Sequence, residues 1–257
     1  MLGDLFNPRV HPAGLSDADL ETLQVFGVRR VLAVADSTAH PATVEGLLAH
    51  FDELVGAQLK RLRRAGLDAA VALGVHPQVV PRRGLTQVLD SLPGYFQQAH
   101  VVALGQLGLK TGSSIELEAL LAQLAIAHQF KRPALVSAPV DETERLTKKI
   151  LATVQQSDLA PGRVLIEGAT GKTVRGILAL GFWAGLTVHP TQLPVERAVA
   201  LVRALGPTRL ILSDAAGFGS SDIVSLGRAA HRLKQAGLSN RVIRLVTHDH
   251  AASLFRR

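Results

Sequence analysis

The sequence contains no cysteine among its 257 residues, and it has few aromatic side chains: eight Phe, one Trp and one Tyr. The lack of cysteine excludes disulfides, zinc–thiolate sites and cysteine nucleophiles. The scarcity of aromatic rings argues against a platform on which single-stranded nucleic acid stacks its bases.

Long hydrophobic runs are also missing, because no stretch of about 18 apolar residues occurs anywhere in the chain. The first ten residues, MLGDLFNPRV, lack the basic flank and apolar run of a signal peptide. We therefore expect a soluble, cytoplasmic protein with no membrane partner. Lysine and arginine outnumber aspartate and glutamate by 28 to 21, so the surface tolerates anions such as nucleic acid or phosphorylated metabolites.

The stretch VLIEGATGKTVRGI, residues 164 to 177, resembles the end of a phosphate-binding loop. The complete motif is G-x-x-x-x-G-K-[ST], because four residues between the glycines let backbone N–H groups surround the phosphates. Gly171, Lys172 and Thr173 fit its end, but isoleucine occupies the position of the first glycine. We predict an ordinary turn from strand to helix, in which Thr170 or Thr173 starts the helix and Lys172 faces solvent.

Short runs rich in β-branched residues alternate along the chain with amphipathic segments, the pattern of repeated βα units. The expected strands are 5–10, 28–35, 69–75, 101–106, 134–138, 163–167, 183–188 and 209–213, and the expected helices include 16–26, 42–66, 115–130, 142–156 and 195–206. This count predicts the α/β class and a single (β/α)₈ TIM-type barrel domain over residues 1–257. A doubly wound open sheet is the alternative, but no G-x-G-x-x-G follows the first strand.

Reactive groups of such barrels lie where the strands end and the βα loops begin. These positions hold Asn7, Arg9, His11, Asp36, His76, Gln106, Ser137, Glu167, Gly168, His189 and Asp214. The sequence therefore predicts a polar pocket at one end of an otherwise apolar barrel.

Five segments in order carry a family resemblance: FNPRVHP, ALGQLGL, ALVSAP, VLIEGATGKTVRGILALGFWAGLTVHP and RLILSDAAGFG. Over almost the whole chain they resemble TatD-like metal-dependent hydrolases of the amidohydrolase superfamily, most specifically in GFWAGLTVHP and SDAAGFG. The resemblance implies the barrel fold. It also implies hydrolysis with one or two divalent ions, which clamp a phosphoryl oxygen and lower the pKa of a bound water.

The metal-ligand positions of that family are mostly substituted in this chain. They fall on Arg9, His11, Gln106, Ser137, Gly168 and Asp214. Of these six positions, only those of His11 and Asp214 still hold a residue type that binds metals. Two ligands are fewer than a catalytic Zn²⁺ usually has, which is three protein ligands and a water.

Each substitution has a physical meaning. Gln106 keeps the shape of a carboxylate without its charge, Ser137 is a short neutral hydroxyl, and Gly168 offers no side chain. The guanidinium of Arg9 is permanently charged. It would oppose a dication at about 4 Å by roughly 8 kcal/mol at an effective dielectric of about 20.

We therefore predict a TatD-like hydrolase homologue with a degenerate metal centre, a pseudoenzyme that binds an anion or a protein partner in the retained pocket. The predicted pocket-lining residues are Arg9, His11, His76, Gln106, Ser137, Gly168 and His189. The alternative is an active hydrolase of phosphodiester or amide bonds. In it, His11, His76, His189 and Asp214 would hold Zn²⁺, Mn²⁺ or Mg²⁺, with Asp214 as the catalytic base. A basic nucleic-acid-binding module, which rests on the net charge, is the third hypothesis. The KRLRR run at 60–64 closes a long helix, where its cations complement the helix dipole in water, and a nucleic-acid contact there is the alternative.

Structural roles compete with these assignments at three positions. His76 and His189 each precede a proline in V-H-P and could bond backbone groups at the start of a loop. Asp214 could equally cap the helix that follows it.

Two further polar positions are expected to be structural. Adjacent strand residues face opposite ways, so Glu167, the neighbour of Gly168, should point outside the barrel. The THDH segment at 247–250 should open the final helix, with Thr247 or Asp249 as its cap.

Overall fold

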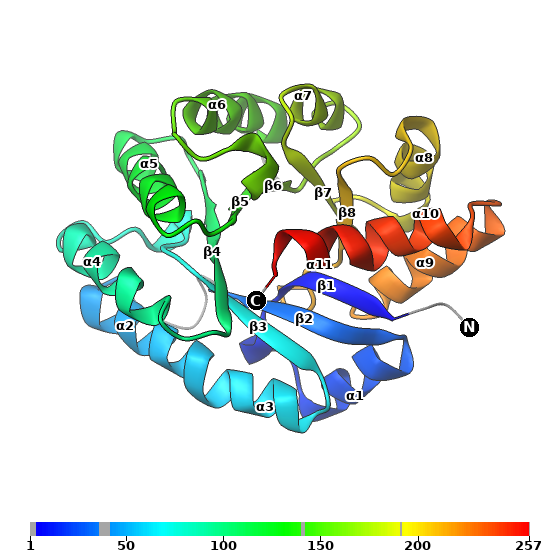
Figure 1. Cartoon of the computed structure of the whole chain (residues 1–257), viewed down its shortest axis with the longest axis horizontal. Coiled ribbons are helices and arrows are strands. Elements are labelled where there is room, and N and C mark those ends of the chain that lie inside the picture. Colours follow the sequence, from blue (N-terminus) through cyan, green and yellow to red (C-terminus); the bar gives the residue numbers. More distant parts are fainter. Residues whose placement is uncertain (1–3, 36–41, 140–141, 191, 257) are drawn as a thin grey trace.

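The computed structural model describes residues 4–35, 42–139, 142–190 and 192–256, and within them eight parallel strands follow one another around a single sheet. They are β1 (Leu5–Val10), β2 (Val28–Val34), β3 (Asp68–Leu73), β4 (Val101–Gly108), β5 (Ala134–Ser137), β6 (Val164–Glu167), β7 (Trp183–Thr187) and β8 (Leu210–Ser213). A parallel bridge between Val10 and Ala216 brings β1 beside the chain that leaves β8. The predicted (β/α)₈ barrel is confirmed (Figure 1).

The helices surround the ring of strands, most of them along its outside and the last one across one end (Figure 1). They are α1 (Asp17–Val25), α2 (Val44–Glu53), α3 (Leu59–Arg64), α4 (Leu85–Tyr95), α5 (Ser114–Gln129), α6 (Thr143–Gln155), α7 (Val174–Ala179), α8 (Val195–Leu205), α9 (Ser225–Gln235), α10 (Asn240–Arg244) and α11 (His250–Leu254). A π-helical segment, Leu54–Gln58, joins α2 to α3, so the long helix expected over 42–66 is continuous. No helix within the described ranges is both long and apolar enough to cross a membrane.

Helix boundaries follow local chemistry. At the start of α1, Ser16 Oγ accepts from the backbone N–H of Asp19 while the Asp19 carboxylate accepts from the backbone N–H of Ser16. This reciprocal pair is a capping box. At the other end of a helix, Gly206 follows α8 with a φ of +74°, a conformation that glycine adopts without steric cost.

Alternate strand residues divide between two cores. The barrel interior holds Phe6, Leu32, Val34, Ala70, Ala72, Val102, Ala103, Leu135, Leu165 and Ile211. Two residues further along β5, β6 and β8 the inward positions become polar, as Ser137, Glu167 and Ser213. The barrel is therefore apolar inside and polar at the carboxyl ends of its strands.

The C-terminal helix closes the opposite end of the barrel (Figure 1). Ala251 and Phe255 pack in the same apolar cluster as Phe6 of β1. His250 Nδ1 hydrogen-bonds to the carbonyl oxygen of Leu210, the first residue of β8, at 2.9 Å. This end is filled by side chains, which leaves the carboxyl ends of the strands as the open face.

The expectation that Thr247 or Asp249 caps the last helix is wrong. The helical segment begins earlier, after Ser239, whose Oγ accepts from the backbone N–H of Val242 at 3.3 Å. A π-helical segment, Leu245–Asp249, carries it on into α11. Thr247 thus lies inside the helix, where its hydroxyl donates to a carbonyl one turn back.

Candidate functional site

A cavity of about 270 Å³ opens at the carboxyl ends of the strands, and we call it the mouth cavity. Four of the predicted pocket residues line it: Arg9, His76, Gln106 and Ser137. The other candidates, His11, Gly168, His189 and Asp214, are described but are not part of its lining. Asp36, the strand-end residue after β2, lies outside the described residues.

Arg9 reaches the mouth cavity from β1 and is only 6% exposed. Its Nε is buried without a partner, and its guanidinium donates no hydrogen bond to any residue that the structure describes. Its Cζ lies 5.6 Å from the ring centroid of Phe218. Burial lowers the pKa of Arg9, and the negative charge of Glu167 opposes that effect.

Glu167 is fully buried at the end of β6 and faces the barrel interior, so the expectation that it points outside is wrong. Its Oε2 accepts from Thr187 Oγ1 at 2.6 Å and from Ser213 Oγ at 3.1 Å. Leu165, two residues before Glu167 in β6, lies inside the barrel. Because side chains alternate along a strand, Glu167 faces the same way as Leu165. Gly168 has a φ of +75° and leaves the strand, so counting back from it fails.

Gln106 of β4 and Ser137 of β5 contact each other at the wall of the mouth cavity. Gln106 Nε2 donates to Ser137 Oγ at 2.5 Å. The remaining polar atom of the amide, Oε1, is buried and has no partner among the described residues.

Asp214, directly after β8, is fully buried and holds three segments together. Its Oδ1 accepts from Asn7 Nδ2 at 2.5 Å and from the backbone N–H of Ala216 at 3.0 Å. Its Oδ2 accepts from the backbone N–H of Leu226, in the first turn of α9, at 3.3 Å. Burial raises the pKa of Asp214 to about 7, against the effect of these hydrogen bonds. The side chain does bond to the start of the following helix, as the structural alternative expected.

The three histidines of the predicted site each have different contacts. His76 Nδ1 accepts from the backbone N–H of Gln78 at 3.2 Å, which confirms its expected bond at the start of a loop. The His11 ring packs 5.0 Å from the ring of Phe218. Burial lowers the pKa of His189, and the positive charge of Arg9 lowers it further. Across the described ranges, no three His, Cys, Asp or Glu side chains are grouped closely enough to hold a metal ion.

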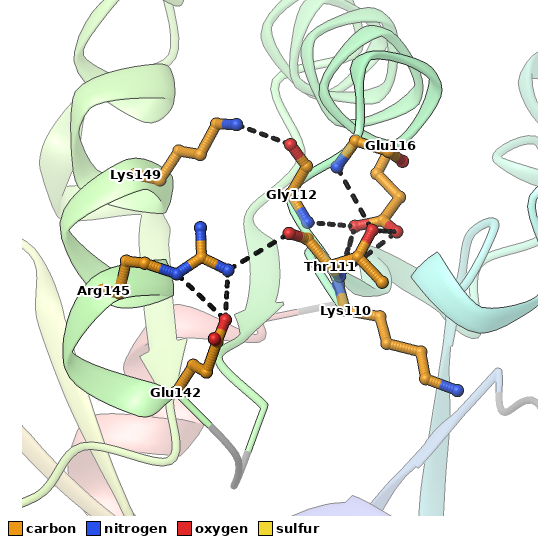
Figure 2. Close-up of polar contacts among 8 residues, drawn as sticks. Lys110, Thr111, Gly112, Glu116, Glu142, Arg145 and Lys149 are labelled. Atoms are coloured by element: carbon orange, nitrogen blue, oxygen red, sulfur yellow. Dashed lines mark hydrogen bonds and ion pairs between the residues drawn. The ribbon is translucent and has the colours of Figure 1, made fainter.

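One wall of the mouth cavity is a loop after β4 that the sequence reasoning missed. The carboxylate of Glu116, in α5, accepts from the backbone N–H groups of Lys110, Thr111 and Gly112 at 2.8 to 3.2 Å (Figure 2). Burial raises the pKa of Glu116, but these bonds and one from the Thr111 hydroxyl outweigh it, so that the pKa is lowered. The S-x-x-E spacing of Ser113 and Glu116 was an available signal, since it is typical of a helix start.

Helix α6 fastens the same loop from the other side (Figure 2). Arg145 donates to the carbonyl oxygen of Thr111 at 3.3 Å, and Lys149 Nζ donates to that of Gly112 at 2.5 Å. Arg145 also pairs with Glu142. The loop therefore has a defined shape, and it carries Lys110 to the rim of the mouth cavity.

The GATGKT segment forms the strand-to-helix turn that we predicted. The backbone N–H of Thr170 donates to Thr173 Oγ1 at 2.9 Å, and the Thr170 carbonyl accepts from Val174, the first residue of α7, at 2.9 Å. Lys172 is exposed and pairs with Glu144 at 2.5 Å. A larger open groove of about 900 Å³ lies beside this turn. We place the candidate site in the mouth cavity and not in this groove, because the buried Arg9 and Gln106 line the mouth cavity.

Comparison with known proteins agrees with the sequence motifs, although no family model matches the chain. A metal-dependent hydrolase of Methanocaldococcus jannaschii, itself uncharacterised, is 27% identical over 239 residues, which cover 93% of this chain and 94% of the relative. The TatD-like protein of Archaeoglobus fulgidus superposes with a TM-score of 0.82 at 22% identity, over 98% of this chain and 100% of its own. The phosphotriesterase homology protein of Escherichia coli, solved with phosphate in its active site, gives 0.75 at 14% identity over all of both chains. The (β/α)₈ fold and the resemblance to TatD-like metal-dependent hydrolases are thus confirmed.

Proposed function

We propose that this chain is a TatD-like hydrolase homologue whose metal centre has degenerated and whose mouth cavity binds a small anion through Arg9. The observation that carries the proposal is the state of Arg9. Its guanidinium is buried, faces the cavity, and has no ion pair within the described part of the chain. It stands where the resembling family has a metal-binding histidine.

The charge of Arg9 calls for an anionic partner. A guanidinium stays protonated at neutral pH, and a buried charge is costly unless it is paired and hydrogen-bonded. Glu167 acts on Arg9 through its charge, but its Oε2 is engaged by Thr187 and Ser213. A carboxylate or phosphate oxygen in the cavity would give Arg9 the direct charge-assisted bond that it lacks.

The residues at the family's ligand positions do not suit a divalent ion. Gln106 and Ser137 are bonded to each other, and Gly168 has no side chain. The oxygens of Asp214 are engaged by N–H donors from three directions. A guanidinium at the cavity wall would add repulsion to this poor set of ligands.

The test has a metal arm and an anion arm. We expect protein purified without a chelating tag to hold less than stoichiometric Zn, Mn or Fe by mass spectrometry, and not to hydrolyse an activated phosphodiester with added Mn²⁺ or Mg²⁺. Stoichiometric metal with turnover that disappears in His11→Ala would contradict the degenerate centre.

In the anion arm, calorimetry at constant ionic strength measures binding of phenylacetate and inorganic phosphate to the full chain. Arg9→Met should abolish anion binding. Arg175→Met is the matched control, because Arg175 is exposed on α7, away from the mouth cavity. Equal binding by the two variants would contradict the role of Arg9.

Nucleic-acid binding through KRLRR is less well supported. Arg61 pairs with Asp17 at 2.7 Å and donates to the carbonyl oxygens of Pro12 and Leu15. Arg63 bonds the carbonyl oxygen of Ala69 at 3.4 Å. These two arginines fasten the end of α3 to neighbouring segments, a role that needs no nucleic acid.

A further inference from the structure

The mouth cavity contains two buried polar atoms that no residue in the described ranges satisfies. One is Nε of Arg9, a donor, and the other is Oε1 of Gln106, an acceptor. The two side chains are 6% and 2% exposed. Buried polar groups in proteins are nearly always hydrogen-bonded, so an unmatched donor and an unmatched acceptor at one cavity mark the atoms to which a bound molecule can hydrogen-bond.

Ser137 adds a second donor. Its Oγ accepts from Gln106 Nε2, and no acceptor in the described residues takes its own proton. A hydroxyl can donate one hydrogen bond while it accepts another. The cavity therefore offers two donors, from Arg9 and Ser137, and one acceptor, from Gln106.

Charge limits the ligand to a single negative charge. The positive charge of Arg9 is opposed by the buried carboxylate of Glu167. The remaining cation at the cavity wall is Lys110, on the rim. A monoanion balances that excess, whereas a dianion would bring uncompensated charge beside Glu167.

Size and lining limit the ligand further. A cavity of about 270 Å³ compares with about 30 Å³ for each water in the liquid, so it has room for roughly ten heavy atoms. Leu109, Pro139 and Phe218 give it apolar walls. A planar carboxylate with a short apolar body fits this combination.

We infer that the mouth cavity takes a small 2-hydroxycarboxylate. The carboxylate would accept from Arg9 and Ser137, and the neighbouring hydroxyl would donate to Gln106 Oε1. A 2-amino acid carries a donor at the same place, but its ammonium would add a cation beside Arg9. This inference rests on the proposed function and adds the chemical class of the ligand.

A matched pair of probes tests the inference. Mandelate and phenylacetate differ only in the hydroxyl, and calorimetry on the full chain measures both, with inorganic phosphate as a third probe. Because one net hydrogen bond contributes about 1 kcal/mol, mandelate should bind about fivefold more tightly than phenylacetate. Phosphate should bind more weakly than mandelate.

Variants assign the preference to its residue. Gln106→Met, which keeps the length of the side chain and removes the acceptor, should bring the mandelate-to-phenylacetate ratio close to one. Gln129→Met, on the exposed end of α5, is the matched control and should keep the wild-type ratio. Ser137→Ala should weaken both ligands without changing the ratio.

The outcomes separate this inference from the function on which it rests. Arg9-dependent binding of both carboxylates with equal affinity would overturn the 2-hydroxy assignment and leave the anion site standing. So would a preference for mandelate that survives in Gln106→Met. Tighter binding of phosphate would overturn the choice of a carboxylate. Absence of binding by all three probes would overturn the proposed function itself.

Discussion

Gly185 of β7 leaves the space that the carboxylate of Glu167 fills. A Cβ atom at position 185 would lie 2.6 Å from Glu167 Oε2 and 3.1 Å from its Cα. A side chain at position 185 and the observed position of the Glu167 carboxylate thus exclude each other. The glycine is what allows a charged residue to lie inside the barrel next to Thr187 and Ser213.

Gly185→Ala should therefore displace Glu167 and break its bonds to Thr187 and Ser213. We expect the free energy of unfolding to fall by about 1 to 3 kcal/mol, as for other overpacked interiors. Urea denaturation measures the change. Gly176→Ala, in α7, is the control, because a Cβ there meets nothing within 4 Å. A similar loss in both variants would show that the clash with Glu167 is not the cause.

Arg9 and Glu167 should be thermodynamically coupled. Glu167→Gln keeps an oxygen for the two hydroxyls but leaves the buried guanidinium without its opposing charge. The loss of stability in the double variant Arg9→Met/Glu167→Gln should be smaller than the sum of the single losses by about 1 to 2 kcal/mol. Urea unfolding of the four proteins gives this difference. Arg9→Met combined with Glu118→Gln, at an exposed position of α5, is the control and should show additive losses. Additive losses in Arg9→Met/Glu167→Gln as well would contradict the coupling.

The raised pKa of Asp214 should appear in the pH dependence of stability. In the unfolded chain this group ionises near pH 3.9, and in the folded protein burial raises its pKa to about 7. The folded state thus keeps a proton that the unfolded state has lost. Its contribution to stability is present below about pH 4 and is lost as the pH rises through 7.

Asp214→Asn removes the titration, so it isolates this effect from that of other groups. Relative to the variant, the unfolding free energy of the wild type should fall by up to about 1.4 kcal/mol per pH unit between about pH 4.5 and 7. Parallel curves for the two proteins would refute the raised pKa.

Glu116 should hold the wall of the mouth cavity in shape. Glu116→Gln loses the charge that strengthens four hydrogen bonds, so stability should fall by about 1 to 2 kcal/mol at pH 7. Because its pKa is lowered in the folded state, the stabilisation is present above the unfolded pKa and disappears as the pH falls through the folded one.

Hydrogen exchange gives the local readout for this clamp. The backbone amides of Lys110, Thr111 and Gly112 should exchange faster in Glu116→Gln. Glu118→Gln, at an exposed position of the same helix, should leave them unchanged. Unchanged protection in both variants would mean that α6, through Arg145 and Lys149, fixes the loop without Glu116.

The sequence by itself determined the barrel. Alternating strand and helix patterns placed all eight strands within about two residues of their observed bounds. The reason is that a parallel strand buried on both faces consists of a nearly continuous run of apolar residues, which the sequence shows directly. Comparison of its motifs with the TatD-like pattern also identified the substituted positions. Three of those positions, Arg9, Gln106 and Ser137, line one cavity together with His76, which its place at the end of a strand had predicted.

Only the tertiary structure decided how the polar side chains pair. Glu167 meets Thr187 and Ser213, 20 and 46 residues away, and Asn7 meets Asp214 across 207 residues. The inward direction of the Glu167 side chain depends on where β6 ends. Gly168, which follows in the left-handed conformation, breaks the alternation at that point. Periodicity along one strand is a local property. Which donors and acceptors remain unmatched depends on the register of neighbouring strands, which the closed barrel fixes only when all eight are assembled.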